Sequence, residues 1–68
     1  MFRNKFTVTI LNEDWNVLID TIKLKHIPRA DELIYLTELS SYYKILTIVH
    51  NFENKNHGIF LIVTKYLD

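Results

Sequence analysis

Residues 15–27, WNVLIDTIKLKHI, decide which fold the sequence predicts. Apolar residues occupy the odd positions from Trp15 to Ile19, and the even positions from Ile22 onward. Because side chains of a strand point to alternate faces, this change of phase near Asp20 predicts a β-bulge, in which one strand gains a residue and bends. A long strand bent by a bulge is how small barrels turn a corner, and Pro28 ends this strand because proline cannot donate to the ladder.

The preceding stretch predicts the partner of this strand. Apolar and polar residues alternate from Lys5 to Leu11, which is typical of a half-buried strand. Residues 12–14, Asn-Glu-Asp, then favour a hairpin turn, because Asn and Asp side chains bind their own backbone.

Two more strands are predicted in the C-terminal third. Residues 42–52 are rich in β-branched and aromatic side chains, and a further strand is expected over residues 59–67. Residues 59–63 are apolar on both parities, so this last strand is expected to be central or covered on both faces. Between them lies a polar hairpin loop, residues 51–58, in which Gly58 is available for a positive φ.

Residues 30–41 fit two interpretations. As a helix, the segment would open at Pro28 or Arg29 and line one face with leucines. As β structure, residues 32–36 form a short strand and residues 37–41 a turn. Periodicity cannot decide between the two over so few residues. The second interpretation is favoured because the surrounding segments are predicted to be strands.

The fold class predicted is all-β: a small five-stranded antiparallel barrel, SH3-like or OB-like, in which closing the sheet removes exposed edges. The alternative is an α+β fold, with a four-stranded sheet and one helix at residues 29–41. Residues 1–68 are expected to form a single domain, because the chain is too short for two.

Composition narrows the function classes. The chain has no cysteine, which excludes disulfides, thiolate metal sites and cysteine nucleophiles and fits a reducing compartment. Eight basic residues balance eight acidic ones, and this neutrality lowers the expectation of a dedicated nucleic-acid binder. Residues 1–10 do not contain the apolar core of a signal peptide, so a cytoplasmic location is expected.

A series of short motifs resembles a group of uncharacterised proteins of bacterial and phage genomes. The series runs Ile-Pro-Arg at 27–29, Asp-Glu-Leu-Ile at 31–34, Tyr-Lys-Ile at 43–45 and Ile-Val-His at 48–50. The group's pattern is Ile-Pro-Arg, a Gly-Asp or Asp-Glu pair, an apolar strand, a turn, then Tyr-x-Val-x-x-Val-x-His. The resemblance implies a small β-barrel of phage or mobile-element origin and no known activity. This chain departs from the pattern by lacking glycine before Asp31 and in the turn at 37–41.

No catalytic or cofactor site is predicted. One glycine cannot make a phosphate loop, and the carboxylate pairs fall at predicted turns, where acids are usually solvated. His50 and His57 flank one predicted hairpin loop and, with Glu53, offer metal-ligand chemistry, but their spacing matches no recognised metal signature. The sequence therefore predicts neither an enzyme nor a metal site, and no small-molecule substrate.

The aromatic residues are the most informative group for function. Exposed rings on a small barrel grip peptides or stack bases. We therefore expect a non-catalytic protein-binding or self-assembly module, in which Tyr35, Tyr42, Tyr43 and Tyr66 hold a protein partner or a second copy of the chain. The alternative is a single-stranded nucleic-acid binder, in which Lys23, Lys25 and Arg29 supply a short positive stripe.

Overall fold

The computed structural model of the chain describes residues 6–51 and 58–66. These residues confirm the all-β prediction, because they form five strands and a single-turn 3-10 helix. No helix within them is long and apolar enough to cross a membrane. The elements are β1 (Phe6–Leu11), β2 (Val17–Leu24), β3 (Leu33–Leu36), η1 (Thr37–Leu39), β4 (Ser41–Asn51) and β5 (Gly58–Lys65).

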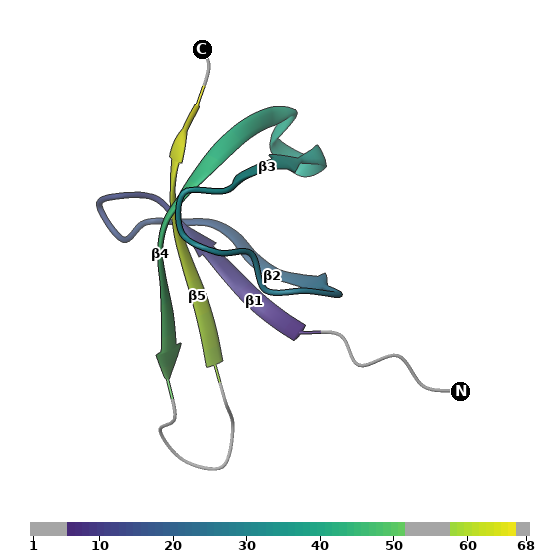
Figure 1. Ribbon diagram of the computed structural model, residues 1–68, viewed down its shortest axis with the longest axis vertical. Helices are drawn as coiled ribbons and strands as arrows, with labels where there is room; N and C mark the ends of the chain where they lie inside the picture. Colours follow the sequence, from purple (N-terminus) through teal and green to yellow (C-terminus); the bar gives the residue numbers. More distant parts are fainter. Residues whose placement is uncertain (1–5, 52–57, 67–68) are drawn as a thin grey trace.

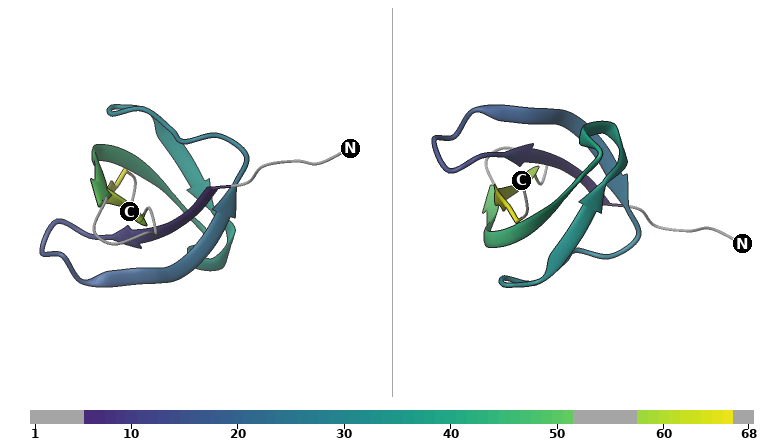
Figure 2. Two further views of the ribbon diagram at one scale, coloured as in Figure 1. Left: turned by 90° about the horizontal axis from the view of Figure 1, so that it is seen from below. Right: turned by 90° about the horizontal axis from the view of Figure 1, so that it is seen from above.

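The five strands form one sheet in the order β2-β1-β5-β4-β3 (Figure 1). Three neighbouring pairs are antiparallel as predicted, whereas β1 and β5 run parallel, so the sheet is mixed. Figure 2 shows the sheet curled around its core as a half-barrel. The predicted closure is absent from the described sheet, because β2 and β3 are its two edges and do not pair with each other.

The bulge predicted in the second strand is confirmed. Val8 of β1 lies opposite Ile22, and Ile10 lies opposite Ile19, so β2 has one residue more than β1 over this interval. Two residues of β2, Asp20 and Thr21, therefore lie opposite the single residue Thr9 of β1, at the point where the apolar phase changes in the sequence. The hydroxyl of Thr9 donates a hydrogen bond to the carbonyl oxygen of Asp20 over 2.8 Å and bridges the two strands at the bulge.

A second irregularity follows closely and was not predicted. Ile10 pairs with Ile19 but Leu11 pairs with Val17, so Leu18 is a further extra residue. Leu18 packs against the core, and Val17 is left 56% exposed. Trp15 and Val17 share the parity of Ile19 in the sequence but not its burial. The strand is also shorter than predicted, beginning at Val17 and ending at Leu24.

Residues 30–41 adopt the strand and turn, and the helical alternative is wrong. Two backbone hydrogen bonds fasten the segment to β4 ahead of the β3 ladder: Asp31 N to Ile45 O at 2.7 Å, and Ile45 N to Glu32 O at 2.9 Å. Helix η1 then makes the turn, and Ser40 takes the left-handed conformation with a φ of 52°. Serine thus occupies the kind of position that glycine usually fills.

Strand β5 is central, as its apolar run predicts. It lies between β1 and β4, and Ile59, Leu61 and Val63 are buried on the concave face of the sheet. Ile62, on the opposite face, is buried as well. Gly58 opens this strand opposite Asn51, and the positive φ expected for it is not found.

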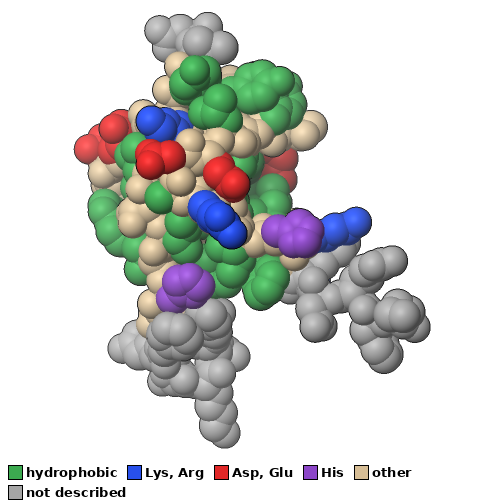
Figure 3. Space-filling view, viewed as in Figure 1, with side chains coloured by type: hydrophobic (Ala, Val, Ile, Leu, Met, Phe, Trp, Pro, Cys, Tyr) green, Lys and Arg blue, Asp and Glu red, His purple; other side chains and the backbone are tan. Residues whose placement is uncertain are grey.

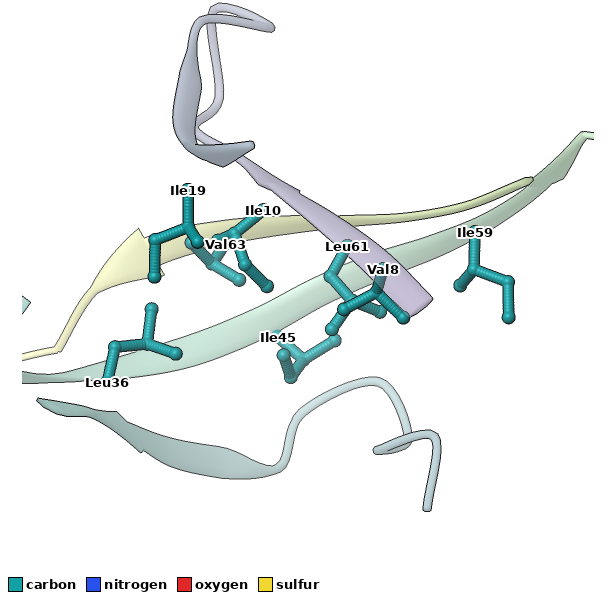
Figure 4. Close-up of a cluster of buried hydrophobic side chains, with 8 residues drawn as sticks. All are labelled: Val8, Ile10, Ile19, Leu36, Ile45, Ile59, Leu61 and Val63. Carbon is teal, nitrogen blue, oxygen red and sulfur yellow. The ribbon is translucent and has the colours of Figure 1, made fainter. Parts of the chain in front are cut away.

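The core lies inside the curl of the sheet and receives side chains from all five strands. Figure 4 shows these side chains converging between the strands. Burial of such branched side chains drives the collapse of a chain this small, because each contributes roughly 1.5–3 kcal/mol. The buried cluster consists of Val8, Ile10, Ile19, Leu36, Ile45, Ile59, Leu61 and Val63.

Adjacent residues of β4 provide a test of this core. Ile45 is fully buried, whereas Leu46 lies at a register shift and is 39% exposed. We expect Ile45→Ala to lower the free energy of unfolding by about 2–5 kcal/mol, because it leaves a cavity. Leu46→Ala should cost less than about 1 kcal/mol, since its side chain already meets water. Urea titration followed by circular dichroism measures both, and equal losses would contradict the register.

Candidate functional site

Three tyrosines form a row across the sheet, which we call the tyrosine row: Tyr35, Tyr42 and Tyr66. Tyr35 of β3 pairs with Tyr42 of β4. Tyr43 pairs with Lys65 at the end of β5, which places Tyr66 beside Tyr42, and the Tyr66 N–H donates to the Tyr42 carbonyl oxygen over 2.9 Å. The register of three strands therefore positions the three rings.

All three rings face away from the core. Ile34 and Leu36, which flank Tyr35 in β3, pack into the core, so Tyr35 points to the convex face. The residues of the row are 50–51% exposed. The rings of Tyr35 and Tyr42 meet edge to face, with centroids 4.9 Å apart and planes at 63°. This geometry suits the charge distribution of aromatic rings and holds both in place.

Tyr43 does not join the row. Adjacent residues of a strand face opposite sides, and Tyr43 is the one that faces inward, half-buried against the core. Of the four tyrosines predicted to form the contact surface, the structure therefore brings together Tyr35, Tyr42 and Tyr66 and separates Tyr43 from them.

Exposed apolar side chains continue from the row over the same face. Hydrophobic side chains gather in Figure 3 at the upper end of the molecule, over the end of β5 and the β3–β4 hairpin. Leu33 lies next to the row in β3, Leu46 follows along β4, and Val17 lies at the β2 edge. We call this surface the convex apolar face; it comprises Val17, Leu33, Tyr35, Tyr42, Leu46 and Tyr66, all at least 39% exposed.

Sequence reasoning missed Leu33 and Leu46 as members of this surface. Leu46 is exposed because β4 carries a register shift between Ile45 and Thr47, so that Leu46 and Thr47 are both turned outward. Nothing in the local pattern marks that shift. Among the described residues, Lys44 is a cation on this face, and its ammonium lies 3.8 Å from the Asp31 carboxylate.

The three basic residues of the predicted positive stripe lie away from the convex apolar face. Lys23 is in β2, at one edge of the sheet, while Lys25 and Arg29 belong to the connection that follows. Lys23 pairs with Thr7 near the start of β1, at the end of β2 opposite to Val17, and Lys25 follows just beyond it. Arg29 lines the groove with Ile34, on the concave side of β3, whereas the tyrosine row faces the convex side. Tyrosine rings and the predicted positive stripe therefore do not form one continuous surface.

A groove of about 530 Å³ opens on the side of the molecule where the sheet does not close. Arg29 and Glu32 lie at it, and the backbone N–H of Arg29 donates to the Glu32 carboxylate over 2.9 Å. Leu24, Ile27 and Ile34 provide its apolar lining and also pack against the core. The groove is thus bordered by β2, by β3 and by the connection between them.

The candidate metal ligands are only partly described. His50 is an exposed residue of β4, and Glu53 and His57 lie outside the described residues. Within residues 6–51 and 58–66, no three His, Asp or Glu side chains come close enough together to hold a metal ion.

Comparison of the chain with protein-family models, with curated proteins and with solved structures finds no match. The resemblance to the Ile-Pro-Arg proteins stays a prediction. Function is therefore inferred from the geometry of the residues.

Trp15 is an exposed aromatic residue in a strained position. The side-chain oxygen of Asn12 accepts hydrogen bonds from the backbone of Asp14 and Asn16, and the Asn12 carbonyl accepts one from Trp15 N–H. This turn ends with Trp15 at a φ of 66°, although its side chain is 58% exposed. Left-handed backbone costs a residue with a side chain about 1–2 kcal/mol.

Replacing Trp15 tests this strain. We expect Trp15→Gly to raise the free energy of unfolding by about 0.5–1 kcal/mol, because glycine adopts this φ freely and the relief exceeds the added entropy of the unfolded chain. Asn16→Gly is the matched control; Asn16 has no positive φ, so the same change there should destabilise. A loss of stability in the Trp15 variant, measured by urea unfolding, would show that the ring makes a compensating contact.

Proposed function

We propose that this chain is a non-catalytic protein-binding module whose contact surface is the convex apolar face, centred on the tyrosine row. The observation that carries the proposal is the alignment of three half-exposed tyrosines from adjacent parts of one sheet. Tyrosine is enriched at binding hot spots, because its ring offers apolar area at low entropic cost and its hydroxyl tolerates water. A sheet holds such rings at fixed spacing before a partner arrives.

The size of the surface suits a weak or transient partner. Six side chains that are each about half exposed offer roughly 500 Å², taking 150–250 Å² for a whole aromatic residue. That area lies in the upper part of the range of about 300–600 Å² for the largest apolar patch on a monomer, a size that often marks function. Interfaces of this extent belong to transient complexes.

The charge of the face favours protein over nucleic acid as the partner. Phosphate contacts supply most of the affinity for nucleic acids, and they require lysine or arginine close to the stacking rings. Lys44 is paired with Asp31, and Lys23, Lys25 and Arg29 lie away from the tyrosines. A surface that is mostly aromatic and aliphatic instead matches an apolar surface of another protein.

Photo-crosslinking in the native cell tests the proposal. A benzophenone amino acid in place of Tyr35, Tyr42 or Tyr66 should yield a discrete crosslinked protein product, because each ring lies within the contact surface. The same amino acid in place of Lys25, which is exposed but lies off this face, should yield little. Mass spectrometry then identifies the crosslinked chain.

Crosslinking at Lys25 and not at the tyrosines would overturn the proposal, as would the absence of a product at every position. Each variant is first checked for the circular dichroism spectrum and unfolding midpoint of the unmodified protein. The three positions are solvent-exposed, so large losses of stability are not expected.

The nucleic-acid alternative makes an opposite prediction. We expect no saturable binding of a fluorescent oligo-dT strand in 20 mM salt, because Lys23, Lys25 and Arg29 do not lie on the tyrosine row and Lys44, beside it, is paired with Asp31. Fluorescence anisotropy provides the measurement. Binding that weakens steeply with salt and is lost in the triple variant Lys23→Ala, Lys25→Ala, Arg29→Ala would favour the alternative.

A further inference from the structure

Strand β3 has a free edge. It pairs with β4 on one side, and none of the strands in residues 6–51 and 58–66 lies on the other. Within the described structure, no backbone hydrogen bond connects residues 33–36 to any segment other than β4. The N–H and C=O groups on this edge are therefore available to another strand.

The ladder identifies which groups are free. Ile45 N–H donates to the Glu32 carbonyl, which therefore points toward β4 at this end of the ladder, while the Ile45 carbonyl accepts from Asp31 N–H. Residues of an antiparallel strand alternate between bonding to their partner and facing away from it. Ile34 therefore bonds to β4, and the backbone groups of Leu33 and Tyr35 face the open side.

The two edge strands of the sheet differ in how well they are protected against pairing with another chain. Charged residues and bulges are the usual devices that keep an edge strand from pairing with another chain. Strand β2 has both, with Asp20 and Lys23 exposed on it and two register shifts along it. The four residues of β3 are Leu-Ile-Tyr-Leu, without charge, proline or bulge.

The groove beside β3 leaves room for the side chains of an added strand. An added strand directs alternate side chains to the concave side of the sheet, as Ile34 does. Ile34 lines the groove together with Leu24 and Ile27, which are only partly buried. An apolar side chain entering there would cover all three.

We propose that β3 pairs antiparallel with β3 of a second copy of the chain, which deepens the proposed function by naming the partner. With Ile34 opposite Ile34 of the other copy, Leu33 of each copy meets Tyr35 of the other. This register is symmetric and uses all the free groups of Leu33 and Tyr35, making four hydrogen bonds. The two tyrosine rows then adjoin on one extended convex face. Because the formal net charge of the chain is zero, electrostatic repulsion between the two copies is small.

Sedimentation velocity over a wide concentration range tests the pairing. The wild-type chain should shift from monomer to dimer as its concentration rises. Leu33→Pro removes an N–H that faces away from β4, so it leaves the internal ladder intact but deletes two of the four intermolecular bonds. Its dimerisation should weaken about thirtyfold, taking roughly 1 kcal/mol for each bond. Leu33→Thr keeps the N–H and should weaken dimerisation much less.

A cysteine at the symmetry axis gives a readout that does not depend on a proline variant folding. The chain has no cysteine, so Ile34→Cys introduces a single thiol. Directly opposed residues that are not hydrogen-bonded lie close enough for a disulfide, so this variant should oxidise to a covalent dimer rapidly. Leu46→Cys, on the convex face and away from the β3 edge, should oxidise slowly.

A wild-type chain that stays monomeric at millimolar concentration would overturn the second-copy proposal, and so would equal oxidation of the two cysteine variants. Such a monomer that still crosslinks a different protein through the tyrosine row would leave the proposed function standing. Dimerisation without any crosslink at the tyrosines would support β3 pairing and contradict the convex face as the contact surface.

Discussion

The burial of β5 on both faces is the constraint on which the rest of the structure depends. Strand β5 joins two units that are local in sequence, the β1–β2 hairpin and the β3–β4–β5 meander, by pairing parallel with β1. Its concave side chains, Leu61 above all, complete the core, while Ile62 on the convex side lies beside Leu11 of β1. A hairpin cannot join parallel strands, so the pairing of β1 with β5 depends on the path of the chain between them.

This central strand also explains where the exposed surface falls. Convex side chains near β1 and β5, such as Leu11 and Ile62, are buried, whereas those toward β3 remain half exposed. The tyrosine row lies at that less-covered side, and its rings follow the register of strands that the core already fixes. A binding surface placed in this way requires no loop to be ordered first, so little conformational entropy is lost when a partner docks.

Local patterns in the sequence predicted the strands, and long-range pairing decided what the patterns left open. The phase change at Asp20 is visible because a bulge reverses the alternation of side chains. The apolar run at 59–63 identifies a central strand because a strand covered on both faces is apolar at every position. The second bulge, at Leu18, left no such mark, so the shared parity of Val17 and Ile19 did not show that the two side chains differ in burial. Tyr42 and Tyr43 illustrate the limit: alternation requires them to face opposite sides, but only pairing with Tyr35 and Ile34 determines which one faces outward.

The two edge strands of the sheet, β2 and β3, differ in a way that bears on function. A half-barrel that does not close has two edge strands, and each must be protected, covered or used. In β2 the residues that bend the strand also protect it, since the bulge positions Asp20 outward and Lys23 follows it. Strand β3 is short, apolar and without a register shift, and it presents the free groups of Leu33 and Tyr35 directly beside the tyrosine row. The hydrogen-bonding edge and the aromatic surface therefore meet at Tyr35. Its backbone groups belong to the free edge, and its ring belongs to the tyrosine row. A partner strand added at this edge would satisfy the backbone and extend the apolar face in the same step, which is why the pairing proposed for β3 and the contact surface proposed for the convex face are physically one site.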